Sequence, residues 1–206
     1  MSNLPFALSD ELAERLASAV DVEGKIPRAV EALGPVSDRD VLLLDGEGSA
    51  LDGAIVGLGA RVVHGSADAP FRSPLADETV DTVVSLWSGF RGVEAGEIAE
   101  ADRILRPAGR LLVIHDYGRD DVSRLQPDRP EYGAWSHRNG PFLNGGFRVR
   151  VLHCFWTFDS QEATTAFLAE AFGDAGRDVA ATLKRPRLSY NVAVYHRTRG
   201  GEAPSD

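Results

Sequence analysis

Polar residues that could bind a ligand or move a proton follow four apolar stretches of the sequence. They lie in the segments Asp45–Ala50, His64–Asp68, Ser85–Ser88 and His115–Tyr117. Each apolar stretch is short, as is typical of a parallel strand that is buried on both faces. Ligands of open parallel sheets bind beyond the carboxyl ends of the strands, so the four segments are predicted to meet at one edge of a sheet.

The segment after the first apolar run has the composition of a nucleotide-binding turn. A strand over 41–44 leads into Gly46 and Gly48, and a helix is expected over 51–58, with Gly59 ending it. Glycines let the backbone approach a ligand, and the start of a helix offers free N–H groups. The same pattern also fits a simple tight connection between a strand and a helix.

Strands and helices are expected to alternate along the chain. Strands are predicted over 41–44, 60–65, 79–87, 109–117, 147–158 and 190–197. Further helices are predicted from Asp10 after an N-cap at Ser9, over 26–33 and 93–105, and after a capping box formed by Asp159 and Glu162. This alternation predicts an α/β fold with a mostly parallel sheet and helices on both of its faces.

The composition excludes several classes of protein. A formal net charge of −9 over 206 residues argues against a nucleic-acid-binding surface, which needs a concentrated basic face. No apolar run is long enough to cross a membrane, and the N-terminus lacks the pattern of a signal peptide. The single cysteine, Cys154, cannot form an internal disulfide. These features favour a cytoplasmic protein without nucleic-acid or membrane partners.

Three motifs in this order resemble the class I S-adenosylmethionine-dependent methyltransferases. They are the glycine turn, the stretch ADAPFRSPLADETVDTVVSLW and the stretch EIAEADRILRPAGRLLVIHDY, followed by a closing antiparallel strand. The most specific part is Glu100–Leu111, which matches the family's helix leading into the central strand. The resemblance covers 41–117 best. It implies a Rossmann-like sheet with a reversed last strand and a methyl donor bound over the first two strands.

The sequence departs from the family pattern in the glycine turn and after the second strand. Leu44 stands where the family has an acid, and Ala50 replaces its third glycine. Ser66 stands where the family has the acid that holds the ribose hydroxyls. Between Gly59 and Val80 there is room for one strand only, so one strand–helix unit is expected to be missing and about six strands should remain.

The resemblance implies a set of site residues. Those expected to bind S-adenosylmethionine are Asp45, Gly46, Gly48, Ala50, Ser66, Asp68, Leu86 and Trp87. The resemblance further implies that Ser66, together with the neighbouring His64, would face the ribose and that Asp68 would contact the adenine amine. If a base is needed, His115 is the catalytic candidate, with Asp116 or Tyr117 orienting the substrate. Asp116 could equally cap the next turn.

The whole chain, 1–206, is expected to form one methyltransferase-like domain. Its expected parts are N-terminal helices in 1–38, a cofactor half in 39–117, a lid loop and substrate half in 118–198, and a frayed tail in 199–206. Trp135 and Trp156 are expected to be packing anchors, and of the two Trp135, in the loop 118–146, is the better candidate for a ligand contact. His137 and His153 have no metal-binding spacing, so no metal is expected.

These observations lead to one main functional hypothesis and two alternatives. The main hypothesis is methyl transfer from S-adenosylmethionine to an unidentified small molecule. The first alternative is a methyltransferase-fold protein that no longer catalyses and serves as a binding or assembly module. The second is a dinucleotide-binding oxidoreductase, which the motif order supports less well. A homodimer is left open by the sequence.

Overall fold

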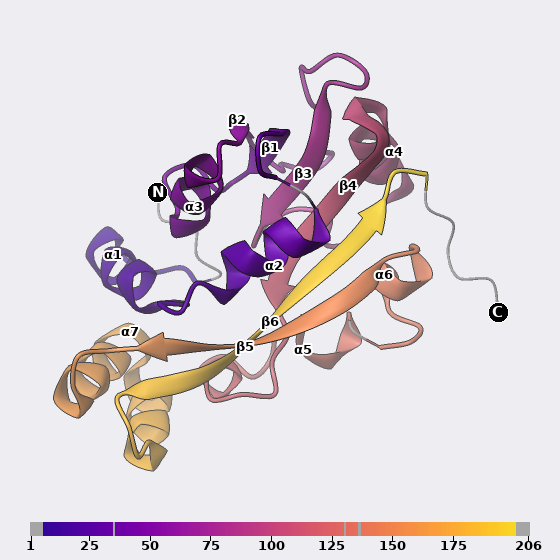
Figure 1. Cartoon of the computed structure of the whole chain (residues 1–206). Coiled ribbons are helices and arrows are strands. Elements are labelled where there is room, and N and C mark those ends of the chain that lie inside the picture. Colours follow the sequence, from indigo (N-terminus) through magenta and orange to yellow (C-terminus); the bar gives the residue numbers. More distant parts are fainter. Residues whose placement is uncertain (1–5, 35, 130, 136, 201–206) are drawn as a thin grey trace.

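The sheet is mixed and has a reversed strand near one edge. The computed structural model describes residues 6–34, 36–129, 131–135 and 137–200, and in this part of the chain six strands pair in the order β2-β1-β3-β4-β6-β5 (Figure 1). The strands are β1 (Asp40–Leu44), β2 (Arg61–Gly65), β3 (Val80–Leu86), β4 (Leu105–Asp116), β5 (Arg148–Thr157) and β6 (Arg187–Thr198). The first four are parallel, and β6 is antiparallel to both β4 and β5. The predicted fold class is thereby confirmed.

Helices cover both faces of this sheet (Figure 1). They are α1 (Asp10–Ala19), α2 (Lys25–Leu33), α3 (Ala50–Gly57), α4 (Ala95–Ile104), α5 (Glu131–Ala134), α6 (Pro141–Asn144), α7 (Gln161–Thr182) and the short 3₁₀ helix η1 (Val122–Arg124). Apolar side chains of α1, α2, α3 and α7 share one hydrophobic core, and those of α4 and α6 share a second core. We call the two sides of the sheet the α2 face and the α4 face.

The ends of two helices test the predicted caps. Ser9 caps α1 as expected, because its Oγ accepts a hydrogen bond from the N–H of Leu12 at 3.4 Å. The N-cap of α7 is Ser160 rather than the predicted Asp159, with Oγ accepting from the N–H of Ala163 at 3.0 Å. The predicted N-cap was therefore displaced by one residue, since serine and aspartate are about equally good caps, and the third helical residue is then Ala163 in place of the acid of a capping box.

Strand β4 begins earlier than its sequence pattern predicts. Leu105 already pairs with Val80, and after a shift in register Arg110 pairs with Thr82. The predicted start at Gly109 thus misses the residues before this irregularity. This shift in register interrupts the alternation of buried side chains, so periodicity alone does not detect the first residues of the strand.

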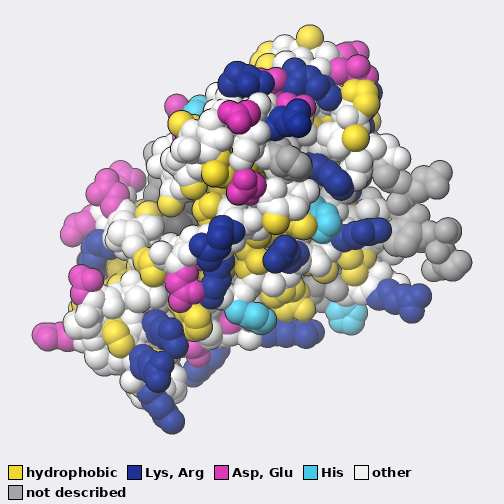
Figure 2. Space-filling model, in the orientation of Figure 1, with side chains coloured by type: hydrophobic (Ala, Val, Ile, Leu, Met, Phe, Trp, Pro, Cys, Tyr) yellow, Lys and Arg dark blue, Asp and Glu magenta, His cyan; other side chains and the backbone are white. Residues whose placement is uncertain are grey.

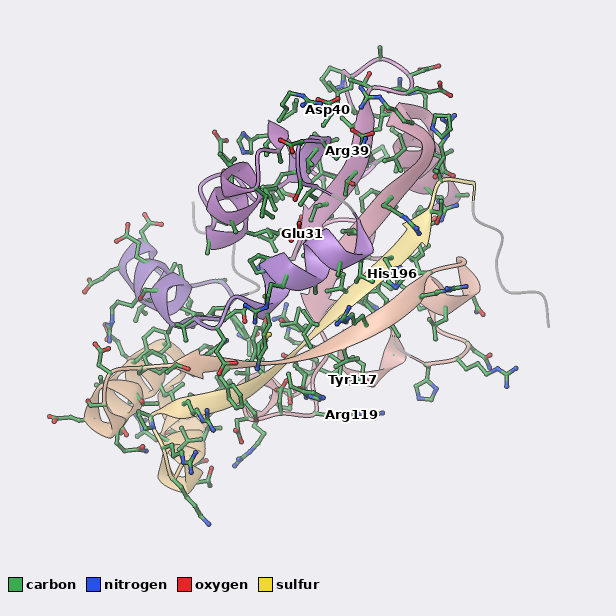
Figure 3. All side chains as sticks on the ribbon, viewed as in Figure 1. Glu31, Arg39, Asp40, Tyr117, Arg119 and His196 are labelled. Atoms are coloured by element: carbon green, nitrogen blue, oxygen red, sulfur yellow. The ribbon has the colours of Figure 1, made fainter. Side chains whose placement is uncertain are left out.

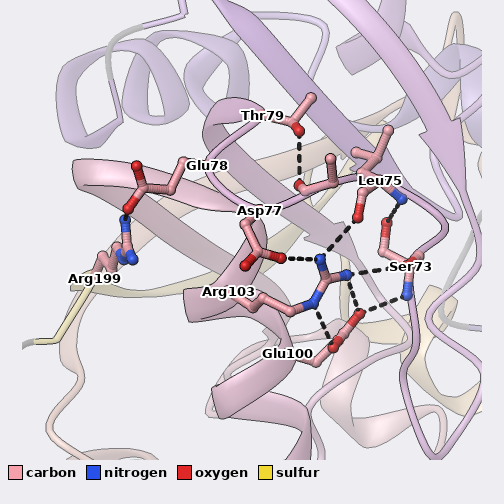
Figure 4. A network of polar contacts seen from close by, with 9 residues as sticks. Ser73, Leu75, Asp77, Glu78, Thr79, Glu100, Arg103 and Arg199 are labelled. Carbon is pink, nitrogen blue, oxygen red and sulfur yellow. Dashed lines mark hydrogen bonds and ion pairs between the residues drawn. The ribbon is translucent and has the colours of Figure 1, made fainter.

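A loop over 66–79 joins β2 to β3 without a helix, as the short sequence between them predicted. Arg103 of α4 fixes this loop by donating to the carbonyl of Leu75 at 2.9 Å, to Asp77 at 2.7 Å and to Glu100 at 2.7 Å (Figure 4). Glu100 also accepts from the N–H of Ser73 at 3.0 Å. The bond from Arg103 lowers the pKa of Glu100 to about 2. The loop is therefore tied to α4 by a charged network.

Candidate functional site

A pocket of about 780 Å³ opens on the α2 face beside the turn between β1 and α3. Its wall comes from α1, from the connection between α1 and α2, from the first residues of α2 and α3, and from the end of β3. This volume lies within the range of small-ligand sites. The pocket therefore stands at the carboxyl ends of β1 and β3, where the fold is expected to bind a ligand.

The turn presents backbone donors to this pocket. Gly48 has a φ of 73°, and a Cβ added to it would meet no atom within 4 Å. Ser49 caps α3 by accepting from the N–H of Asp52 at 3.1 Å. In the part of the chain that the structure describes, the N–H groups of Ala50 and Leu51 have no partner. Two free donors at a helix N-terminus favour a carboxylate or another anionic group.

Asp52 is a component of the turn that the sequence reasoning missed. Its Oδ2 accepts from the N–H of Gly48 at 2.9 Å and lies 3.0 Å from Nε2 of His64. Burial raises the pKa of Asp52, but the bonds from Gly48 and His64 together outweigh it, so the net pKa is lowered. Asp52 thus stabilises the turn and links α3 to β2. The spacing Ser49-x-x-Asp52 has the sequence pattern of a capping box and could have revealed it, although Asp52 accepts from the N–H of Gly48 and not from that of the cap residue.

The opposite side of the same turn is closed by Asp45. Its carboxylate accepts from the N–H of Ala67 at 3.0 Å and from Oγ of Ser88. Ala67 packs so closely on the loop after β3 that a Cβ added to Gly89 would lie 2.5 Å from its own Cβ. We call this contact among Asp45, Ala67, Ser88 and Gly89 the Asp45 closure. It joins the loops that follow β1, β2 and β3.

The structure separates the expected cofactor residues into two groups. Those that line the pocket are Gly48, Ala50, Leu86 and Trp87. Those that do not are Asp45, Gly46, Ser66 and Asp68. Gly46 packs beneath the turn, where an added Cβ would lie 2.6 Å from Leu43, while Ser66 and Asp68 are exposed on the loop after β2.

His115 does not reach the pocket. It is 1% exposed and lies on the α4 face, where its Nε2 is 3.0 Å from the carbonyl oxygen of Gly89 and its ring centroid is 4.8 Å from that of Trp135. Side chains alternate along a strand, so β4 directs His115 away from the face that bears the pocket. His115 stays a prediction as the base, if one is needed, and its side chain faces away from this pocket.

Asp116 faces the correct side of the sheet but is engaged by other side chains. It is 2% exposed, pairs with Arg129 at 2.9 Å and accepts from the hydroxyl of Tyr190. Burial, and then the charge of Asp116, raise the pKa of Tyr190 well above its usual value. The ring of Tyr190 lies 6.1 Å from that of Trp87, a pocket residue. Asp116 therefore supports the pocket wall from beneath.

Tyr117 and the long loop 118–146 also lie away from the pocket. Tyr117 packs against the core of the α4 face, with Arg119 over its ring at 5.9 Å (Figure 3). Trp135 is 7% exposed and packs on Phe142 as well as His115, so it is a packing residue of the core, as expected for a tryptophan anchor. No described residue of the loop lines the pocket.

The pocket is acidic. Glu14, Asp21 and Glu47 are its charged lining residues among those the structure describes, and neither lysine nor arginine joins them. Both carboxylate oxygens of Asp21 accept backbone N–H groups at the start of α2, at 3.0 and 2.6 Å. This charge distribution favours a ligand that carries a positive group beside its anionic one. In the described ranges, the pocket included, no three His, Cys, Asp or Glu side chains gather as a metal site would require.

Comparisons with known proteins identify the fold. No protein-family model matches the sequence, and no curated protein matches it. Three solved structures align with TM-scores of 0.53. A proposed type II methyltransferase from Anaeromyxobacter dehalogenans is 17% identical, with 84% of this chain and 94% of that chain covered.

The other two structures are similar to the chain over most of its length. A proposed methyltransferase from Bacillus halodurans C-125 is 13% identical, with 85% of this chain and 99% of that chain covered. A proposed methyltransferase from an antibiotic biosynthesis pathway of Anabaena variabilis ATCC 29413 is 14% identical, with 87% and 98% covered. Because all three alignments cover most of both chains, the chain has the Rossmann-like fold of the class I S-adenosylmethionine-dependent methyltransferases.

None of the described helices is long and apolar enough to span a membrane.

Proposed function

We propose that the protein binds S-adenosylmethionine in the pocket beside Gly48 and transfers its methyl group to a small molecule. The observation that carries this proposal is the position of the pocket, at the first strand–helix turn of a methyltransferase fold. A cleft at this turn, with free amides on one side and apolar side chains on the other, is the arrangement that an amphiphilic ligand requires.

The lining residues match the chemical groups of this cofactor. The free N–H groups of Ala50 and Leu51 would bind the carboxylate of its methionine part. Glu14 and Glu47 would attract its ammonium and sulfonium groups, since opposite charges stabilise each other in a partly enclosed site. The bound cofactor supplies an electrophilic methyl group. Ser66 and Asp68 remain predicted contacts for the part of the ligand that extends past His64.

The chain's own contribution to the reaction is alignment and exclusion of water. Val20, Ile26 and Leu86 give the pocket an apolar wall. Methyl transfer needs a nucleophile aligned with the methyl group more than it needs an acid–base pair. Of the titratable groups of the pocket, Glu14 and Glu47 are exposed and would accept a proton from the acceptor if its nucleophile had to be deprotonated.

A second candidate function is binding without catalysis. His115 lies on the other face of the sheet, and the Asp45 closure occupies the loops at one side of the turn. Both observations favour a methyltransferase-fold protein that holds a ligand as a binding or assembly module. The two candidates differ in whether a methyl group leaves the bound cofactor.

Calorimetric titration with S-adenosylmethionine and S-adenosylhomocysteine tests the site. Ala17 is exposed on α1 and lines the pocket, so Ala17→Trp should fill it and weaken binding at least about tenfold, a loss of roughly 1.4 kcal/mol. Ala163→Trp on α7 is the matched control, because this alanine is equally exposed and lies outside the pocket. Its affinity should equal that of the wild type.

The outcomes separate the candidates. Binding that Ala17→Trp abolishes and Ala163→Trp preserves supports the pocket, and release of labelled methyl to an acceptor mixture then supports the enzyme. Binding without any methyl release favours the binding module. Absence of heat with both ligands at millimolar concentration would refute the proposal.

A further inference from the structure

Strand β5 leaves part of its backbone unpaired at the edge of the sheet. Its outward-facing groups can be identified because the carbonyl of Phe155 accepts from the N–H of Asp21 at 3.0 Å, and that of His153 accepts from Nζ of Lys25 at 2.7 Å. Backbone groups alternate in direction along a strand, so those of Val149 and Val151 also face outward. Among the described residues, the backbone groups of Val149 and Val151 make no hydrogen bond outside the pairing of β5 with β6.

Arginine side chains gather beside this free edge. Arg148 and Arg150 are exposed on β5, and Arg110 lies on the neighbouring part of the α2 face. Burial, followed by the charges of these three arginines, lowers the pKa of His196. Figure 2 shows dark blue side chains around a histidine on this face, and Figure 3 places His196 over β6. The protein is acidic overall, yet this surface is basic.

A groove of about 400 Å³ lies between α2 and the free edge of β5. It is lined by Lys25, Arg28, Ala29 and the β5 residues 150–153. The nearby acids are partly engaged: Glu23 pairs with Lys25 at 2.7 Å, and Glu31 accepts from Oγ of Ser37 at 2.7 Å. The groove thus combines free strand amides with cationic walls.

We propose that this edge binds an extended acidic peptide of a partner protein, which adds to β5 as a further strand. The peptide backbone would pair with Val149 and Val151, and its carboxylates on one face would meet Arg148, Arg150 and Arg28. A strand exposes every second side chain on the same face, so acids at alternate positions fit arginines two residues apart. This site is independent of the cofactor pocket and shares no lining residue with it.

The free amides favour a peptide over other anions. A phosphate-bearing small molecule would use the arginines but would leave the strand groups of Val149 and Val151 without a role. A nucleic acid needs a long basic track, whereas α1 and the cofactor pocket beside this surface carry Glu14, Asp21 and Glu47. Strand addition uses both features of the edge, its hydrogen-bonding groups and its charge.

An array of random octapeptides tests this inference with the whole chain. We expect the bound peptides to be enriched in Asp and Glu at alternate positions, and the double variant Arg148→Glu, Arg150→Glu to bind them at least about tenfold more weakly. Arg177→Glu is the control charge reversal, since Arg177 is exposed on α7 and lines neither the groove nor the cofactor pocket. A selected peptide with N-methylated backbone amides at alternate positions should also lose binding, because it cannot pair with the strand.

Results of three other kinds would overturn the proposal. Selection of no peptide, or selection that survives the double charge reversal, would show that the edge is not an acidic-peptide site. A selected peptide can be N-methylated at its odd or at its even positions. If both methylated forms bind as tightly as the unmodified peptide, strand addition is excluded. Tighter binding of a 20-nucleotide single-stranded oligothymidine than of any peptide would mark the surface as a nucleic-acid site instead.

Discussion

The two sides of the turn after β1 differ in what fills them. On the α2 face, Gly48 borders an open pocket of about 780 Å³ with free helix amides. On the other side, Asp45 binds the N–H of Ala67 and the hydroxyl of Ser88, and the loops after β2 and β3 are in contact. The turn after β1 therefore has an open side, which can bind a ligand, and a closed side, which joins the loops after β1, β2 and β3.

The difference explains why two glycines of one motif have different roles. Gly46 is required by packing, since an added Cβ would collide with Leu43. Gly48 is required by its backbone conformation, because its φ is positive. It also leaves the space beside the turn open, so that a ligand can approach the backbone. A glycine motif can thus be retained for the strand–helix turn, for the ligand, or for both.

Breaking the closed side should have the largest effect on stability. We expect Asp45→Ala to lower the free energy of unfolding by about 3 kcal/mol, because it removes two hydrogen bonds to a carboxylate and places alanine at a φ of 54°. Urea denaturation measures this loss. Asp45→Asn, which tolerates the same backbone conformation, should lose only about 1 kcal/mol. Equal stability of all three proteins would show that the closure contributes nothing.

Substituting the two glycines should sharpen the comparison. Gly46→Ala places a methyl group 2.6 Å from Leu43 and should cost about 2 kcal/mol through overpacking. Gly48→Ala meets no atom within 4 Å, so only its positive φ should cost stability, about 1 kcal/mol. Thermal unfolding measures which of the two variants loses more stability, and we expect the larger loss for Gly46→Ala. The reverse order would contradict the assignment of open and closed sides.

The charged network of Arg103 and Glu100, which ties the loop 66–79 to α4, should give a smaller, pH-dependent effect. Glu100 has its pKa lowered from 4.5 to about 2, so its contribution is present above pH 4.5 and is lost as the pH falls toward 2. Because Arg103 is partly exposed and solvent screens the pair, Glu100→Gln should cost about 1 kcal/mol at pH 7. The difference from wild type should shrink by pH 2. If the difference in the free energy of unfolding stays constant with pH, the effect of Glu100→Gln comes from packing and not from the ion pair.

Much of the fold could be predicted because it depends on local pattern. The apolar runs that became β1 and β3 are buried on both faces, and turn residues mark their ends. The cap of α7 was misplaced by one residue because Asp159 and Ser160 are both good caps. The first residues of β4 were missed because a shift in register interrupts the strand.

The site was harder to predict because it depends on contacts between distant segments. Gly48 and Trp87 follow strand ends, so they could be found from the sequence. Glu14 and Ala17 of α1 could not, since no pattern shows which helix covers the turn. The direction of His115 depended on the register of β4, and a shift of one residue moves a side chain to the other face.

The most direct test of the central claim is a titration of ¹⁵N-labelled protein with S-adenosylhomocysteine, followed by amide chemical shifts. We predict shifts at the N–H groups of Gly48, Ala50 and Leu51 and at the indole of Trp87, with the N–H of Ala67 unchanged in its bond to Asp45. Shifts confined to Ala67 and Gly89, with none at Gly48 or Trp87, would contradict a cofactor site on the open side of the turn.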